Sequence, residues 1–408
     1  MTFRHIKIIN ILQTNLGGIK MRNKIKLFVS LMIVFTVIIS GSFIEEISAS
    51  EKIVIGNLQD MSGPTSVWSS AVTKGAELAV EIINREGGVL GKEIELITYD
   101  TELNVQEAIS GYYRLVDRDG AVAVVGAPIS ADGVALSPIA EDERVPMFGS
   151  WMDERATTKE DGSPYKYSFL IQPSSTQQAQ FMASYAMNEL NMNNFGVLYN
   201  EANPYSVSLA EPFEKYVEEL GGEIVYSDTF GSDDRDFRTQ ITRILNNNPD
   251  AIYIPNYIEE ITLIVEQTRA MGIDVPFLAG LDAAPPFAEL AGDHANNVYY
   301  VDNVDLNDEE LKEIAEEYVS KFGEEPVNKS YLGYDSILAT VEAIKIAGST
   351  NPQDIAEAGA KIENLEVTTG NLSISPENHR PYGLSMPIFE IVDGEYKLLN
   401  YYIPEKLK

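Results

Sequence analysis

Short β-rich runs alternate with amphipathic helical stretches along this chain, and this alternation constrains the fold more than any other feature. Most runs have four to eight residues, are rich in Val, Ile and Tyr, and are bounded by Gly, Pro, Asn or Asp. This pattern is typical of buried parallel strands. Strands are predicted at residues 53–58, 94–99, 121–126, 145–148, 195–199, 223–230, 251–255, 275–280 and 298–301.

Helices are predicted between these runs, because apolar residues recur there at helical spacing and glycines follow several of the stretches. The predicted helices cover residues 71–84, 105–118, 179–190, 206–220, 237–246, 259–271 and 311–322. A β–α–β alternation predicts an α/β fold with parallel sheets. The 408 residues exceed what one hydrophobic core usually holds, so we expect two lobes, with ligand loops at the carboxyl ends of the strands.

The first fifty residues have the composition of a secretory signal peptide. Six basic residues precede an apolar run from Leu27 to Gly41, and small residues follow at Ser48 and Ser50. The apolar run is shorter than the roughly 20 residues that span a membrane, so cleavage after Ser50 is expected, with a retained membrane anchor as the alternative. Met21 is an alternative start, because it opens a signal of ordinary length.

Cysteine is absent and the net charge is strongly negative. Without cysteine the chain forms no disulfide or thiolate metal site, and it has no cysteine to carry a lipid. The formal net charge is −32, and it becomes −36 without residues 1–50, which hold six basic and two acidic residues. Such a chain repels phosphate backbones, so nucleic-acid binding is not expected.

No familiar catalytic motif occurs in the sequence. It contains no H-E-x-x-H, no G-x-S-x-G and no phosphate-binding G-x-x-x-x-G-K-[ST] pattern. His294 and His379 are both predicted in surface loops. The sequence therefore predicts a binding protein with no catalytic residues, no cofactor and no metal site.

An ordered series of short motifs resembles the type I periplasmic substrate-binding proteins of the leucine/isoleucine/valine class, which serve ABC transporters for branched-chain amino acids and amides. Each motif is weak alone, and the series extends over residues 53–400. The matching segments are Met61–Pro64, Gly75–Ala79, Ile83–Asn84, Gly87–Gly88, Gly91, Tyr99–Asp100, Val124–Gly126, Val145–Pro146, Tyr205, Asp236–Phe237, Tyr257–Gly272 and Gly333–Asp335.

The resemblance implies two doubly wound parallel-sheet lobes joined by a three-crossover hinge. Lobe one would comprise residues 51–171 and 302–375, and lobe two residues 172–301 and 376–408. A small amino acid or amide would bind in the cleft between them and favour closure. Membrane permease subunits would be the protein partner, and the binding protein would be an extracytoplasmic monomer.

Lobe-one loops supply the first implied ligand contacts. Ser130, in the loop after the third strand, would contact the ligand carboxylate; its alternative role is helix capping. In the loop after the fourth strand the family usually has small or hydroxyl residues, and Trp151 and Asp153 depart from that pattern. Asp153 could bind the ligand ammonium beside a Trp151 wall; alternatively, Asp153 caps a turn and Trp151 packs under the lobe edge.

Aromatic and acidic residues supply the remaining implied contacts. Trp68 is placed against the ligand side chain, and Tyr205 and Tyr257 at ligand-facing strand ends of lobe two, although both tyrosines could be core or rim residues instead. Asp282 is placed opposite the ligand ammonium, with a turn-forming role as its alternative. Tyr334 is expected to open a helix near the hinge and to line the cleft.

Three other functions remain open at the level of sequence. The aromatic residues and added acids could form a cage for a cationic or quaternary-ammonium ligand. The same fold also serves ligand-sensing receptor domains, although no second apolar span of about 20 residues follows the first. An enzyme remains possible in principle, because a fold does not determine a function.

Overall fold

The computed structural model describes residues 52–126 and 129–408, and the predicted signal peptide lies outside these residues. Lys52–Lys408 form one compact unit. Its first sheet has the order β2-β1-β3-β4-β5 with every pair parallel, as expected for strands linked by crossover helices. The strands are β1 (Ile53–Gln59), β2 (Ile94–Asp100), β3 (Ala123–Gly126), β4 (Met147–Gly149) and β5 (Ser168–Leu170).

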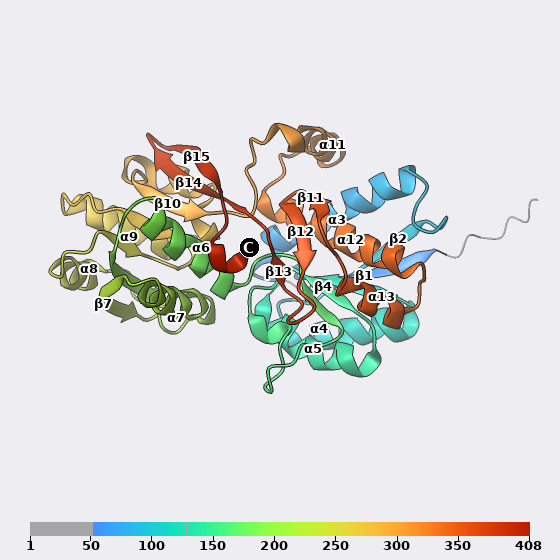
Figure 1. Ribbon diagram of the computed structural model, residues 1–408. Helices are drawn as coiled ribbons and strands as arrows, with labels where there is room; N and C mark the ends of the chain where they lie inside the picture. The colour runs from blue at the N-terminus through green and yellow to red at the C-terminus, as the bar shows by residue number, and fades with distance from the viewer. Residues whose placement is uncertain (1–51, 127–128) are drawn as a thin grey trace, which may run out of the picture. The chain divides into compact units, whose positions relative to one another are not determined.

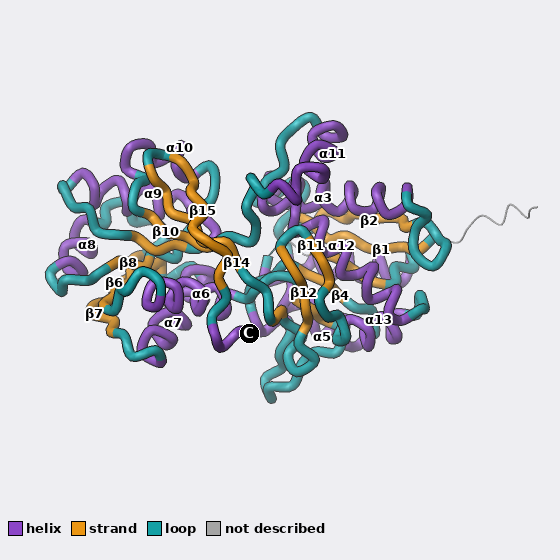
Figure 2. The backbone as a smooth tube through the Cα atoms, turned by 45° about the horizontal axis from the view of Figure 1, so that its top comes forward, coloured by secondary structure: helices purple, strands orange, loops and turns teal. Residues whose placement is uncertain are grey.

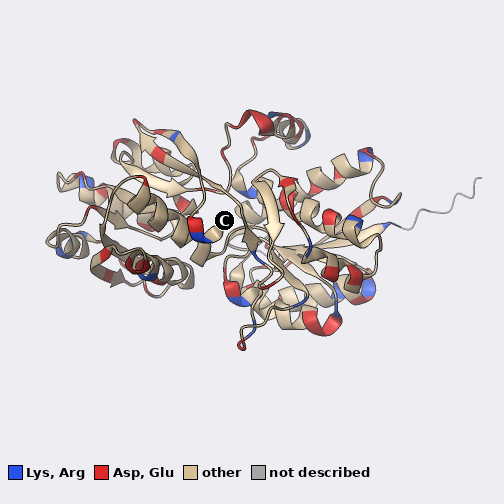
Figure 3. Ribbon diagram, in the orientation of Figure 1, with Lys and Arg blue, Asp and Glu red and all other residues tan. Residues whose placement is uncertain are grey.

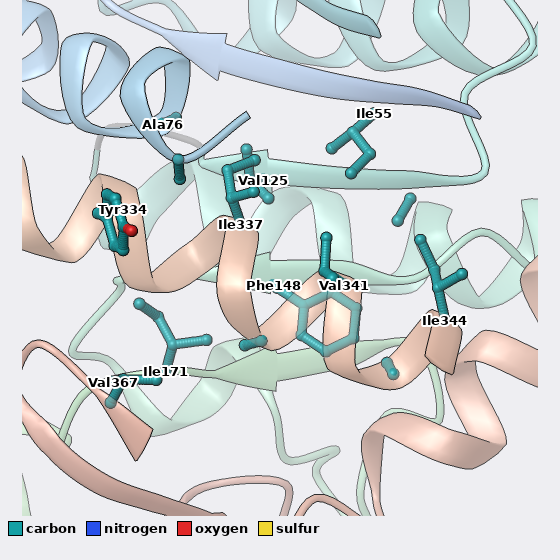
Figure 4. Packing of buried hydrophobic residues seen from close by; sticks show 14 of the residues in the cluster. Ile55, Ala76, Val125, Phe148, Ile171, Tyr334, Ile337, Val341, Ile344 and Val367 are labelled. Carbon is teal, nitrogen blue, oxygen red and sulfur yellow. The ribbon is translucent and has the colours of Figure 1, made fainter. Parts of the chain in front are cut away.

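Helices cover both faces of the first sheet (Figure 1). One face packs against α3 (Ser66–Arg85), α12 (Asn328–Ala347) and α13 (Pro352–Gly359). The other face packs against α4 (Val105–Tyr113), which continues as a π-helical turn, and α5 (Ser130–Glu143). Figure 4 shows the first of these cores, where Ile337 and Val341 of α12 lie among Val125 and Phe148 of the sheet.

The second sheet has the order β15-β14-β10-β9-β8-β6-β7. Its first five strands in the chain are parallel, and β14 pairs antiparallel with both β10 and β15. The strands are β6 (Asn194–Asn200), β7 (Glu223–Phe230), β8 (Ala251–Tyr253), β9 (Phe277–Ala279), β10 (Val298–Val301), β14 (Met386–Val392) and β15 (Glu395–Tyr402).

Helices also cover both faces of the second sheet (Figure 2). On one face lie α6 (Ser175–Asn188) and α7 (Pro204–Glu219). On the other face lie α8 (Arg238–Leu245), α9 (Ile258–Ala270) and α10 (Phe287–Ala291). A third, antiparallel sheet comprises β11 (Leu365–Val367), β12 (Gly370–Ile374) and β13 (Pro381–Tyr382), and α11 (Lys312–Phe322) precedes α12.

Three connections link the parts of the chain that build the two large sheets: β5 to α6, β10 to α11, and β12 through β13 to β14. The first two connections contact each other, because Asn303 Nδ2 donates to Gln172 Oε1 at 2.8 Å. In the third connection the Arg380 guanidinium lies 2.6 Å from Glu154. All nine strands expected from the apolar runs are present. The lobe boundaries given above stay a prediction.

Two residues lie elsewhere than the sequence predicted. His379 is 5% exposed and stacks on Phe169 with ring centroids 4.4 Å apart, so its predicted place in a surface loop is wrong. Tyr334 does not open a helix, because α12 begins six residues earlier, and its side chain belongs to the core of the first sheet. In both cases an aromatic ring is covered by elements distant in the sequence.

Candidate functional site

Three aromatic rings from different parts of the chain lie next to one another. The Tyr205 and Tyr257 rings stack with centroids 5.0 Å apart, and the Trp68 ring lies 6.5 Å from Tyr257. Trp68 and Tyr257 are 45% and 41% exposed. The array therefore offers open aromatic surface to which a small molecule can bind.

A carboxylate lies at the end of the aromatic array. The hydroxyl of Tyr205 donates a hydrogen bond to Asp282, and no other donor to Asp282 is found among the described residues. Burial raises the pKa of Asp282, while the Tyr205 hydrogen bond and the Lys329 ammonium partly oppose this shift. A carboxylate that accepts a hydrogen bond from one uncharged hydroxyl can accept further hydrogen bonds. The strongest of these would come from a cationic group.

The topology explains why three of these four residues meet. Tyr205, Tyr257 and Asp282 follow β6, β8 and β9 of the second sheet by five, four and three residues, whereas Trp68 lies nine residues after β1 of the first sheet. Asn203 caps α7 by accepting from the backbone N–H of Tyr205, which fixes the start of that helix. Loops at the carboxyl ends of parallel strands share one edge of a sheet, and that edge is where α/β proteins bind ligands.

Ser130 is the first residue of α5 and contacts the loop after β4. Its Oγ accepts the backbone N–H groups of Met152 and Asp153 at 3.2 and 3.3 Å. Ser130 therefore joins the two lobe-one loops for which the resemblance implied ligand contacts. Within residues 52–126 and 129–408 this hydroxyl donates no hydrogen bond, and its predicted contact with a carboxylate stays a prediction.

Asp153 and Trp151 both have partners inside the protein. The Asp153 carboxylate accepts from the backbone N–H of Arg155 and pairs with the Arg155 guanidinium at 2.6 Å, as a turn-capping residue does. Trp151 is 2% exposed and belongs to the hydrophobic core between the first sheet, α4 and α5. The ring lies where a Cβ at Gly133 or Gly149 would come within 2.6 Å of it. These positions match the alternatives of turn capping and packing under the lobe edge.

Two acidic residues, Asp132 and Asp60, lie near the start of α5, where Ser130 is. Asp132 is 0% exposed, and neither carboxylate oxygen has a hydrogen-bond partner among the residues that the structure describes. Burial and, less strongly, the nearby Asp60 carboxylate raise the pKa of Asp132 to about 6. Figure 3 shows other Asp and Glu residues spread over the described chain, most of them exposed. A buried carboxylate without a partner destabilises the folded protein when it is ionised. This destabilisation should therefore depend on pH.

Replacing Asp132 with Asn is expected to stabilise the protein increasingly as the pH rises. The folded protein binds a proton at Asp132 more tightly than the unfolded chain does, so wild-type stability falls between about pH 4 and about pH 6, by up to about 3 kcal/mol. The Asp132→Asn variant lacks this loss. Urea unfolding of both proteins from about pH 4 to about pH 8 measures the difference; the exposed Asp293→Asn variant is the control. A constant difference across this range would contradict the prediction.

Sequence reasoning missed two groups near the site. Gln172 Nε2 donates to the carbonyl oxygen of Ser150, which positions the loop after β4 from the first connection between the sheets. Lys329, in the first turn of α12, affects the electrostatics of Asp282. Neither residue belongs to a recognisable motif, and only their position in space connects them with the site.

Comparison with known proteins defines the family. The family model described as "Periplasmic binding protein" matches residues 52–395. The chain belongs to this family. A leucine-, isoleucine-, valine-, threonine- and alanine-binding protein of Pseudomonas aeruginosa is 25% identical over 328 residues, which cover 79% of this chain and 86% of that protein. The Leu/Ile/Val-binding protein of Escherichia coli is 25% identical over 61% of this chain and 67% of its own length.

Solved structures of similar proteins confirm the fold. A leucine-binding protein from Thermotoga maritima is 29% identical with a TM-score of 0.74, covering 87% of this chain and 100% of that one. A branched-chain amino acid transporter substrate-binding protein from Streptococcus pneumoniae, solved with isoleucine, is 28% identical with the same TM-score and coverage. The predicted α/β fold of the type I periplasmic binding proteins is thus confirmed.

The homologues in this family are extracytoplasmic solute-binding proteins. Within residues 52–126 and 129–408, no helix is long and apolar enough to cross a membrane. In the same residues, no group of three or more His, Asp or Glu side chains is arranged to hold a metal ion. The chemistry that the site offers is reversible binding through aromatic surface, hydroxyl groups and carboxylates.

Proposed function

We propose that this protein is the extracytoplasmic solute-binding component of an ABC importer and that its ligand is a small amino acid or amide of the branched-chain type. The observation that carries this proposal is the array of Trp68, Tyr257, Tyr205 and Asp282. It combines apolar surface for a side chain with a carboxylate for an ammonium group. Relatives named for leucine, isoleucine and valine binding support the same ligand class.

In this proposal the ligand contacts both lobes of the protein. It thereby shifts the equilibrium between an open and a closed conformation towards the closed one. Only contacts made better in the closed form can cause such a shift. The closed form would then be recognised by membrane permease subunits, with the protein acting as a monomer and no bond chemistry at the site. Residues 1–50 would direct export as a signal peptide, and without cysteine the protein would not be a cysteine-anchored lipoprotein.

Calorimetry tests the ligand class directly. We expect leucine, isoleucine or valine to bind with a dissociation constant in the micromolar range or below, and small-angle scattering to show a smaller radius of gyration at saturation. Trp68 is the exposed one of the two tryptophans, so its fluorescence should also change on binding. Absence of heat, compaction and fluorescence change over a wide concentration range would contradict the proposal.

A cationic or quaternary-ammonium ligand is the second candidate. It is favoured by the three adjacent rings, since aromatic faces attract cations, and by the acidic residues near Ser130. Choline titrated under the same conditions distinguishes the two candidates. Binding of choline without binding of leucine would select the second candidate, which would also be compatible with a ligand-sensing receptor domain.

A further inference from the structure

Lys329 carries an ammonium group that has no partner in the described part of the chain. It lies in the first turn of α12, directly after Asn328, and is only half-buried. No hydrogen bond or ion pair of its Nζ is formed within residues 52–126 and 129–408. Most other basic side chains of this acidic protein, such as Lys74, Lys159 and Lys321, do form ion pairs. The Lys329 ammonium is therefore available to an anion.

Neighbouring contacts hold Lys329 close to the candidate site. The side chain of Asn328 donates to Asp302 Oδ1 at 3.1 Å, which ties the start of α12 to the connection after β10. The Lys329 ammonium acts electrostatically on both Asp302 and Asp282. The strands β9 and β10 pair in parallel, so Asp282 and Asp302 follow neighbouring strand ends. The contact of Asn328 with Asp302 places Lys329 beside them.

The surroundings of Ser130, at the start of α5, are poorly suited to a ligand carboxylate, because acidic residues already lie there. The backbone N–H groups of Met152 and Asp153, which could bind a carboxylate, already donate to Ser130 Oγ. Asp132 adds a buried acid within two residues of Ser130, and Asp60 lies close enough to act on Asp132. A ligand carboxylate placed there would be repelled by these acids, since like charges at short range in a low dielectric interact strongly.

We propose that Lys329 binds the anionic group of the ligand, so that the ligand is an amino acid with a free carboxylate held between Lys329 and Asp282. This inference rests on the proposed function and narrows it from amino acids and amides to zwitterions. Hydrogen bonds between charged groups are the strongest polar contacts available in such a site. Lys329 is then a specificity-determining residue that discriminates acids from the corresponding amides.

The test compares leucine with leucinamide on two variants. The Lys329→Met variant keeps the length of the side chain and removes its charge, and the matched control is Lys345→Met at the exposed, distant end of α12. We expect Lys329→Met to weaken leucine binding at least about tenfold and leucinamide binding less than about threefold, as measured by calorimetry. Lys345→Met should change neither, and Lys329→Arg should keep most of the affinity for leucine.

Three results would overturn the inference. They are equal losses for leucine and leucinamide in Lys329→Met, no loss for either, or a wild-type protein that binds leucinamide or choline but no amino acid. A wild-type protein that binds none of these compounds contradicts the proposed function itself. If the Lys329→Met variant fails to fold, the rate of lysine acetylation is measured on the wild-type protein with and without leucine. Bound leucine should protect Lys329 from acetylation and leave Lys345 reactive. Equal reactivity of both lysines in the presence of leucine would contradict the inference.

Discussion

Replacing Asp282 with Ala is expected to weaken amino-acid binding about 100-fold or more. Among the described residues Asp282 has a single donor, Tyr205, and it is expected to accept the ligand ammonium in a partly desolvated site. Removing one partner of such a charge-assisted pair leaves the other charge without compensation, which typically costs about 2–5 kcal/mol. Calorimetry with leucine on the wild type and the variant gives the ratio of dissociation constants.

Two further variants separate the charge of Asp282 from its packing. Asp282→Asn keeps the shape and the contact with Tyr205, so a loss close to that of Asp282→Ala would assign the effect to the charge. Asp293→Ala, an exposed acid on a neighbouring turn, controls for a general change in net charge. An Asp282→Ala variant that binds within about threefold of the wild type would remove Asp282 from the site.

Replacing Gly75 with Val is expected to lower the free energy of unfolding by about 3 kcal/mol or more. At Gly75 helix α3 crosses α12 so closely that a Cβ would lie 1.8 Å from the backbone oxygen of Ser330. Backbone atoms within a helix cannot move aside as a flexible side chain can, so the two helices must separate and open the core between them. Overpacking of this kind costs about 1–3 kcal/mol and more where the neighbour is rigid.

Urea unfolding followed by circular dichroism measures this effect. Gly231→Val is the matched control, because a Cβ there meets only the Asp234 side chain, at 3.7 Å, and should change the midpoint little. Gly333, where a Cβ would lie 1.9 Å from the backbone oxygen of Val72, should behave like Gly75. A stable Gly75→Val variant would show that the helices do not cross as closely as described.

The strands were predictable because buried parallel strands are short, apolar and separated by turn residues. Several helices could be predicted as well, since a helix that covers one face of a sheet keeps a 3.6-residue apolar pattern. Helix α12 was not predicted as a whole. It is buried against α3, α13 and the sheet, so apolar and small residues occur all round it and the pattern disappears. Helix α5 contains Pro138, which is normally a helix-ending signal.

Prediction of the site was limited by the direction of its side chains. Strand order in the sequence is enough to place Trp68, Tyr205, Tyr257 and Asp282 on strand-end loops. It does not reveal that the Trp151 ring turns into the core, because that depends on the space left by Gly133 and Gly149, which come from two different elements. The pairing of Asp153 with Arg155 is local, by contrast, and could have been anticipated from their two-residue separation.

The amino-acid sequence alone determined the α/β class, nine of the ten parallel strands of the described residues and the family, because these depend on local periodicity and on ordered motifs. The three-residue strand β5 (Ser168–Leu170) was not predicted. The tertiary structure decided which polar groups have hydrogen-bond or ion-pair partners. Asp282 and Lys329 lie 47 positions apart in the chain and act on each other through space. The contacts of Ser130 with the loop after β4 likewise follow from packing. Electrostatic and steric interactions act over a few ångströms whatever the separation along the chain, so only the folded arrangement determines what the site can bind.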